Sequence, residues 1–99
     1  MATLHVLSHS PFTDNRLSSC LRILGSQDAV LLCGDAVYTL QAGSAQRQTL
    51  ERLPEAIALY ALDEDVHARG LAHPARLTLI DYPAFVALSC QYDKVNTWL

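Results

Sequence analysis

The sequence predicts an α/β fold with a small, mostly parallel sheet of four to five strands and helices on both faces. Three observations lead to this prediction: short apolar runs alternate with helix-like segments, the connections between them are short, and the run at residues 29–33 is apolar without alternation. An unbroken apolar run is typical of a strand that is covered on both faces, as in parallel sheets. Because 99 residues fill one hydrophobic core, residues 1–99 are expected to form a single domain.

The first third of the chain is predicted to fold as strand, helix, strand. The strand at residues 4–7 is followed by a loop that contains Pro11, because proline lacks a backbone N–H donor and disfavours helix in the residue before it. The helix is predicted from four residues that share one helical stripe: Leu17, Cys20, Leu21 and Leu24. Asp14 or Asn15 is expected to cap its start, and Gly25 to close its end.

The remaining elements follow from the same signals. In chain order they are helices at residues 36–40 and 45–53, a strand at 57–62, a helix at 63–69, a strand at 77–80, a helix at 82–92 and an edge strand at 95–99. Asp63, Glu64 and Asp65 place acidic groups at a helix N-terminus, where the helix dipole favours them. The helix at residues 82–92 carries one stripe made of Tyr82, Phe85, Val86 and Ser89. Trp98 is expected to dock against the body of the protein.

The composition is rich in apolar residues for so small a protein. Hydrophobic residues make up 51% of the chain and charged residues 17%. Surface scaling gives about 5,600 Å² folded against roughly 15,800 Å² unfolded, so about two-thirds of the surface can be buried in a monomer. The excess apolar surface predicts association with other subunits.

Charge and hydropathy exclude several classes of function. A net charge of -3 has the wrong sign for direct nucleic-acid binding. No apolar run approaches the roughly 18 to 20 residues of a membrane span, and the N-terminus lacks a targeting pattern, so we expect a cytoplasmic protein without membrane contact. Three cysteines without close spacing are typical of reduced thiols.

Motifs for cofactors and metals are missing. The sequence has neither G-x-G-x-x-G nor G-x-x-x-x-G-K-[ST], and it has no G-x-S-x-G elbow, so no cofactor and no hydrolytic triad are predicted. A flavin or nucleotide bound in the flavodoxin manner needs no such signature and stays open. His5 and His9 would lie roughly 13 Å apart along an extended segment, too far for one metal ion. With His67 and His73, they are interpreted as solvent-facing or capping side chains.

The cysteines are the remaining candidates for chemistry. Cys20 could act as a nucleophilic thiol or as a small hydrophobic residue, and its leucine-lined stripe favours the second interpretation. Cys33 lies at the carboxyl end of an apolar strand, and parallel sheets bind ligands at this end of their strands. Cys90 lies near the end of the last helix and is expected to be solvated or partly packed.

Several short stretches together are characteristic of a known family. They are Leu4-His5 with Ser10-Pro11-Phe12, Leu31-Leu32 leading to Asp35-Ala36-Val37-Tyr38, Tyr60-Ala61-Leu62-Asp63-Glu64-Asp65 running into Ala68-Arg69-Gly70-Leu71, and Ile80-Asp81-Tyr82 with Phe85-Val86 and Trp98. In their order and spacing, the chain resembles the TusB/DsrH family of the DsrE-like sulfur-relay superfamily nearly from end to end. The resemblance implies a DsrE-like fold with flavodoxin-like layering. One departure is Ala36, where the family usually has glycine.

The resemblance also implies partners. In the tRNA-thiolation version, the family member forms a heterohexamer with TusC-like and TusD-like subunits. Sulfur passes from TusA through this complex to TusE, for 2-thiolation of a wobble uridine. The sulfur-carrying cysteine belongs to the TusD-like subunit, after its third strand, where this sequence has Leu62 and Asp63. A structural, non-catalytic subunit is therefore expected.

The alternative is a DsrH-like subunit of a sulfur-oxidation complex with Cys20 as a persulfide-accepting thiol, because Cys20 matches a cysteine of that branch. In either case, the interface anchors predicted by residue type are aromatic: Tyr38, Tyr82, Phe85 and Trp98.

Overall fold

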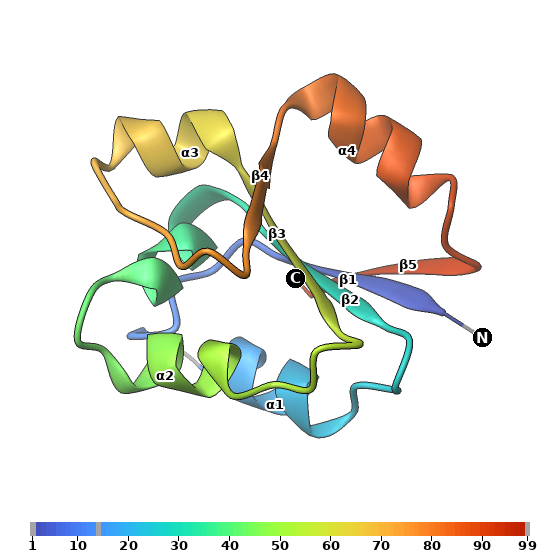
Figure 1. Cartoon of the computed structure of the whole chain (residues 1–99), viewed down its shortest axis with the longest axis horizontal. Helices are drawn as coiled ribbons and strands as arrows, with labels where there is room; N and C mark the ends of the chain where they lie inside the picture. The colour runs from blue at the N-terminus through green and yellow to red at the C-terminus, as the bar shows by residue number, and fades with distance from the viewer. Residues whose placement is uncertain (1, 14, 99) are drawn as a thin grey trace.

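Five parallel strands form one sheet in the order β4-β3-β2-β1-β5 in the computed structural model, which describes residues 2–13 and 15–98 (Figure 1). The strands are β1 (Thr3–Leu7), β2 (Ala29–Leu32), β3 (Ala58–Leu62), β4 (Thr78–Ile80) and β5 (Lys94–Trp98). The helices are α1 (Arg16–Arg22), the 3₁₀ helix η1 (Gly34–Leu40), α2 (Ala45–Glu51), α3 (Asp63–Ala68) and α4 (Tyr82–Ser89). The predicted parallel sheet is confirmed, and all four residues of β2 are buried.

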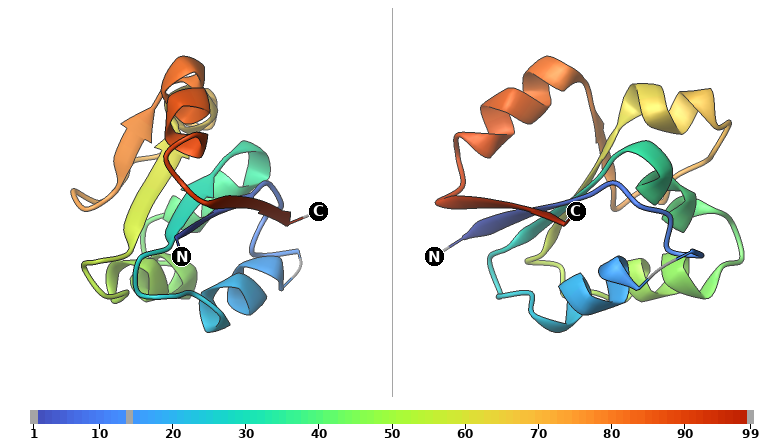
Figure 2. Two further views of the ribbon diagram at one scale, coloured as in Figure 1. Left: turned by 90° about the vertical axis from the view of Figure 1, so that its right-hand side faces the viewer. Right: turned by 180° about the vertical axis from the view of Figure 1, so that it is seen from behind.

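The direction of the connections decides which face each helix covers. The chain moves from β1 through β4 toward one edge of the sheet and then returns to the opposite edge to form β5. Because crossovers between parallel strands are right-handed, the last connection places its helix on the other face. Accordingly, α1 and α2 lie together on one side of the strands and α4 lies on the other (Figures 1 and 2).

Two hydrophobic clusters fill the spaces between sheet and helices. The larger one joins Leu7 of β1 and alternate residues of β2 and β3 to α1, η1, α2 and α3, with Leu50 and Val66 among its buried members. The smaller one lies between the sheet and α4 and includes Leu4, Leu31 and Leu88. The predicted layered fold is therefore confirmed, and over residues 2–13 and 15–98 the second face is covered by one helix, α4.

The ends of α1 differ from the prediction. Asn15 occupies the N-cap position, but its side chain makes no capping hydrogen bond, and Asp14 lies outside the described residues. The helix ends at Arg22, earlier than its apolar stripe. Gly25 does not close it, because its N–H donates to Oδ2 of Asp28 at 2.8 Å and so shapes the turn into β2.

The buried face of α4 is rotated away from the predicted stripe. Tyr82 and Val86 are exposed, whereas Phe85 is half-buried and Leu88 is buried against the sheet. The rotation follows from the position of the helix over Leu4 and Leu31, which Leu88 covers. The helix is also shorter than predicted and ends at Ser89.

The C-terminal segment forms an edge strand, as predicted. β5 pairs with β1 in parallel from Thr3 opposite Lys94 to Leu7 opposite Trp98. The Trp98 side chain packs against the larger cluster, so the expected docking of the tryptophan is confirmed. No helix in the described parts of the chain is long and apolar enough to span a bilayer.

Candidate functional site

Cys20, the candidate thiol of the sequence analysis, lies in the core. Its side chain is fully buried in the larger cluster, among residues of α1 and the sheet. Burial, and secondarily the negative charge of Asp28, raises the pKa of Cys20 to about 12. The thiolate is the nucleophilic form of cysteine, so this environment suppresses the reactivity that persulfide chemistry needs.

The other two thiols lie in different places. Cys33 follows β2 and is half-buried, with its Sγ–H donating to the carbonyl of Leu7 at 3.5 Å. Burial, followed by the charge of Asp65, raises the pKa of Cys33. Cys90 follows α4 and is exposed. None of the three ends β3, where Leu62 leads directly into Asp63 of α3.

The carboxyl ends of β2 and β3 are joined by an acidic side chain. Gly34 has a φ of +52° and comes so close to the chain after β1 that a Cβ would lie 3.3 Å from the carbonyl oxygen of Ser8. Its N–H donates to Oδ2 of Asp65 at 2.8 Å. The acidic start of α3 was predicted as a capping feature. The structure gives Asp65 a second role, because it fixes the turn that follows β2.

Arg69 lies at the same carboxyl end of the strands and binds several of the polar groups there. Its Nη2 donates to Oδ1 of Asp35 at 2.9 Å, its Nη1 donates to the carbonyl of Asp65 at 3.2 Å, and its guanidinium lies 5.4 Å from the ring centroid of Tyr38. The hydrogen bond to Asp35 raises the already high pKa of Arg69 further. The cluster ties η1 to α3 through charge and stacking, and its polar groups bond mostly to one another.

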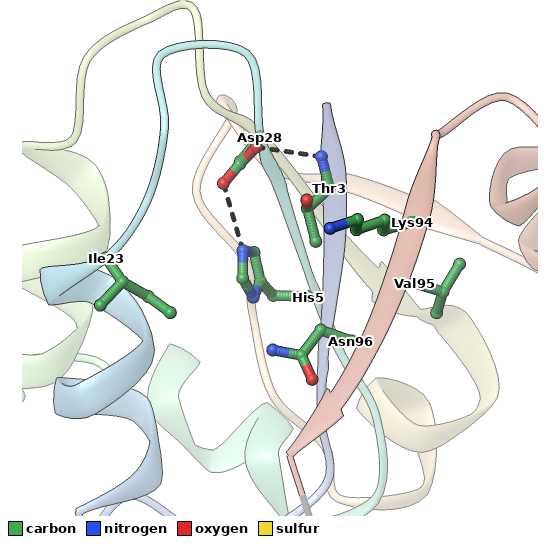
Figure 3. Close-up of a pocket in the computed structure, with 7 residues that line it drawn as sticks. All are labelled: Thr3, His5, Ile23, Asp28, Lys94, Val95 and Asn96. Carbon is green, nitrogen blue, oxygen red and sulfur yellow. Dashed lines mark hydrogen bonds and ion pairs between the residues drawn. The ribbon is translucent and has the colours of Figure 1, made fainter. Parts of the chain in front are cut away.

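A second polar cluster lies at the opposite, amino-terminal end of the strands (Figure 3). A cavity of about 640 Å³ is lined by Thr3, His5, Ile23, Asp28, Lys94, Val95 and Asn96. The carboxylate of Asp28 accepts hydrogen bonds from the N–H of Thr3 at 3.0 Å and of Gly25 at 2.8 Å, and it lies 3.2 Å from Nε2 of His5. On the other side of the ring, Nε1 of Trp98 donates to Nδ1 of His5 at 3.1 Å.

The charge of Asp28 is stabilised by these donors. Burial alone would raise the pKa of Asp28, but the hydrogen bonds from Gly25, Thr3 and His5 together lower it. His5 is 3% exposed, so its interpretation as a solvent-facing or capping residue is wrong. Asp28 was not predicted as part of a site, although a charged residue directly before the apolar run of β2 was an available signal.

Among the described residues, no group of three or more His, Cys, Asp or Glu side chains could hold a metal ion. Of the four aromatic residues predicted as interface anchors, Trp98 and Phe85 pack inside the chain and Tyr38 stacks with Arg69. Tyr82 is 58% exposed, and its ring makes an edge contact with that of Phe85.

Comparisons with known proteins agree with the resemblance. A family model described as DsrH like protein matches residues 9–95. Curated proteins named Protein TusB from Erwinia tasmaniensis and Escherichia coli are 39% and 35% identical over 97 residues, covering 96% of this chain and 99% of each relative. The crystal structure of the ychN protein from E. coli superposes with a TM-score of 0.77, covers 99% of this chain and 100% of its own, and at 20% identity shares the fold. The chain therefore belongs to the family of DsrH-like proteins.

Proposed function

We propose that this chain is a structural subunit of a TusBCD-type sulfur-relay complex that supports persulfide transfer for 2-thiolation of the tRNA wobble uridine. In this proposal it forms a cytoplasmic heterohexamer with TusC-like and TusD-like subunits, and the complex receives sulfur from TusA and passes it to TusE. The chain itself carries no sulfur and contacts neither tRNA nor a membrane.

The family assignment and the relatives named Protein TusB support a role in sulfur relay. The observation that carries the structural part of the proposal is the end of β3. There the resemblance implies a sulfur-carrying cysteine in the TusD-like subunit, whereas here Leu62 leads into Asp63 and the nearby carboxylate of Asp65 is bound to Gly34. At this end of the sheet, Asp65 therefore links α3 to the turn after β2, and β3 ends without a thiol.

The exposed apolar side chains support the assembly part of the proposal. Among the residues that the structure describes, five large hydrophobic ones are exposed: Phe12, Ile23, Tyr82, Val86 and Val95. Two of them, Tyr82 and Val86, lie one turn apart on α4, and adjoining exposed apolar side chains of this kind mark surfaces that partners cover.

The alternative function, a DsrH-like subunit with Cys20 as persulfide acceptor, requires a donor persulfide to reach the sulfur of Cys20. The complete burial and raised pKa of Cys20 argue against it, because the chain would have to open around α1 before the thiol could react.

The two functions are distinguished by sulfur transfer in a reconstituted complex with TusC-like and TusD-like subunits. The test variant is Cys20→Ala, because serine would bury a hydroxyl group at a cost of about 1–3 kcal/mol if it found no partner. Cys90→Ala serves as a matched control at an exposed cysteine. Radioactive sulfur loaded through TusA is then followed onto each subunit and onto TusE.

We expect both variants to pass labelled sulfur to TusE at the rate of the unmodified complex, with no label on this chain. A loss of transfer in Cys20→Ala alone, together with label on this chain in the unmodified complex, would establish Cys20 as a persulfide acceptor, as the alternative requires. Failure of the three chains to assemble would contradict the proposal itself.

A further inference from the structure

The imidazole of His5 is buried between one acceptor and one donor. Its Nε2 lies 3.2 Å from Oδ2 of Asp28, and its Nδ1 lies 3.1 Å from Nε1 of Trp98. The three residues come from the first strand, from the residue before β2 and from the last strand, so the array connects both ends of the chain.

The chemistry of the two partners defines the protonation state of the ring. An indole N–H is a donor without acceptor capacity, so Nδ1 of His5 must keep its lone pair to receive it. An ionised carboxylate only accepts, so the proton of the neutral ring must be on Nε2, facing Asp28. The neutral Nε2–H tautomer is therefore the form that satisfies both hydrogen bonds.

A proton added to His5 must bind at Nδ1, where it meets the N–H of Trp98. Two donors then face each other, and the hydrogen bond to Trp98 is lost. We propose that His5 is a pH-sensitive latch for the C-terminal strand, which holds Trp98 when neutral and releases it when protonated.

The place of Trp98 in β5 gives this latch its effect. β5 lies at the edge of the sheet and pairs with β1, and its residues Lys94, Val95, Asn96 and Thr97 are exposed. Of the five residues in the strand, Trp98 is the one whose side chain is partly buried. Release of the indole therefore removes the principal side-chain anchor of the strand while leaving the rest of the sheet in place.

The other groups around the ring act on its protonation in opposite directions. Asp28 favours the imidazolium, because its hydrogen bond to Nε2 becomes charge-assisted. Lys94 of β5 lines the same cavity and opposes a second positive charge. From α1, Cys20 remains an uncharged thiol, and the other lining residues, Thr3, Ile23, Val95 and Asn96, carry no charge.

The test uses nuclear magnetic resonance of the full chain labelled with ¹⁵N. Trp98 is the only tryptophan, so the spectrum contains one indole N–H signal, and intrinsic fluorescence reports on the same residue. The titration runs from about pH 8 to about pH 5, the range in which histidine side chains change charge. The ¹⁵N shifts of His5 give its tautomer, and the indole signal gives the state of the Trp98 hydrogen bond.

We expect the Nε2–H tautomer of His5 at the upper end of the range, and a shift of the Trp98 indole signal with the same midpoint as the protonation of His5. In His5→Gln, whose amide can accept from Trp98 and donate to Asp28 without titrating, the indole shift should disappear. His67→Gln, at an exposed histidine of α3, should leave it unchanged.

Three results would overturn the latch. They are an Nδ1–H tautomer, a His5 that stays neutral over the whole range, and an indole signal that stays constant while His5 titrates. All three are read from the unmodified chain, so the test does not depend on the folding of a variant. The proposal is also independent of the role of the chain in sulfur relay.

Discussion

The three cysteines differ because their surroundings differ. Cys20 is enclosed by the core, Cys33 is half-buried and bonded to a backbone carbonyl, and Cys90 is exposed. Burial disfavours the charged thiolate, which explains why the pKa values of Cys20 and Cys33 are raised. At the scale of single residues, accessibility therefore predicts reactivity.

Alkylation of the native chain should follow this order. We expect iodoacetamide at neutral pH to modify Cys90 first, Cys33 more slowly and Cys20 only after denaturant is added. Peptide mass spectrometry at successive times measures the three rates. Modification of native Cys20 as fast as Cys90 would show that the thiol is reachable, and would revive its role as a persulfide acceptor.

Asp28 should contribute stability that depends on pH. Its pKa in the folded protein lies below the ordinary value of 3.8. The unfolded chain thus binds the proton more tightly, so the contribution is complete above the unfolded pKa and is lost as pH falls through the folded pKa. Asp28→Asn, which loses the carboxylate that the N–H groups of Thr3 and Gly25 bond to, should lower the free energy of unfolding at neutral pH by about 1–3 kcal/mol.

Urea unfolding at several pH values tests this expectation. The difference between the unmodified chain and Asp28→Asn should shrink as pH falls below the unfolded pKa. Glu64→Gln, at an exposed carboxylate of α3, should behave like the unmodified chain. A difference that stays constant with pH would mean that the charge of Asp28 is not what stabilises this corner.

Among the helices in the described part of the chain, α4 is the one that covers the second face of the sheet. Its start is fixed by Asp81, whose Oδ1 accepts a hydrogen bond from the N–H of Ala84 at 2.8 Å. Pro83 adds a residue whose missing N–H costs nothing in the first turn of a helix. Local sequence thus determines where α4 begins.

Removal of this cap should weaken the protein by a predictable amount. Asp81→Ala is expected to lower the free energy of unfolding by about 1 kcal/mol, because the N–H of Ala84 loses its partner. Asp81→Asn retains an acceptor oxygen and should lie close to the unmodified chain. Urea unfolding of both variants gives the comparison, and equal losses in the two would assign the effect to charge instead of capping.

The strands were easier to predict from the sequence than the ends of the helices. The unbroken apolar run of β2 and the polar breaks around it were sufficient to predict a parallel sheet. The end of α1 was not predictable from its stripe, because Asp28 draws the N–H of Gly25 into a turn that only the folded chain forms.

The polar clusters were harder to predict for the same reason. His5 and Asp28 are 23 residues apart in sequence and meet only through the register of β1 and β2. Arg69 and Asp35 are 34 residues apart in sequence and meet because α3 packs against η1. Such contacts follow from topology, so a pattern of neighbouring residues does not reveal them.

For the whole molecule, the surface explains why partners are expected. The folded chain exposes 5451 Å², against about 5,600 Å² for a monomer of this mass, so it is as compact as an ordinary small protein. Its exposed hydrophobic residues therefore do not result from loose packing. Tyr82 and Val86 lie one turn apart on the outer side of α4, where a partner could cover both.

Charge placed on this side of α4 should weaken assembly while sparing the fold. We expect the double variant Tyr82→Lys with Val86→Lys to unfold at nearly the same urea concentration as the unmodified chain, since both side chains are exposed. Its affinity for TusC-like and TusD-like subunits should fall at least tenfold. Gln48→Lys, at an exposed position of α2, should bind normally. Unchanged binding by the double variant would place the interface elsewhere on the chain.

The most direct test of a structural role is the mass of the assembly and of its subunits after sulfur loading. Native mass spectrometry of the complex purified with TusC-like and TusD-like subunits should give a hexamer with two copies of each chain. Under denaturing conditions, the mass of one added sulfur atom should be found on the TusD-like subunit and never on this chain. An added sulfur on this chain, or a chain that remains alone in the presence of its partners, would contradict the account.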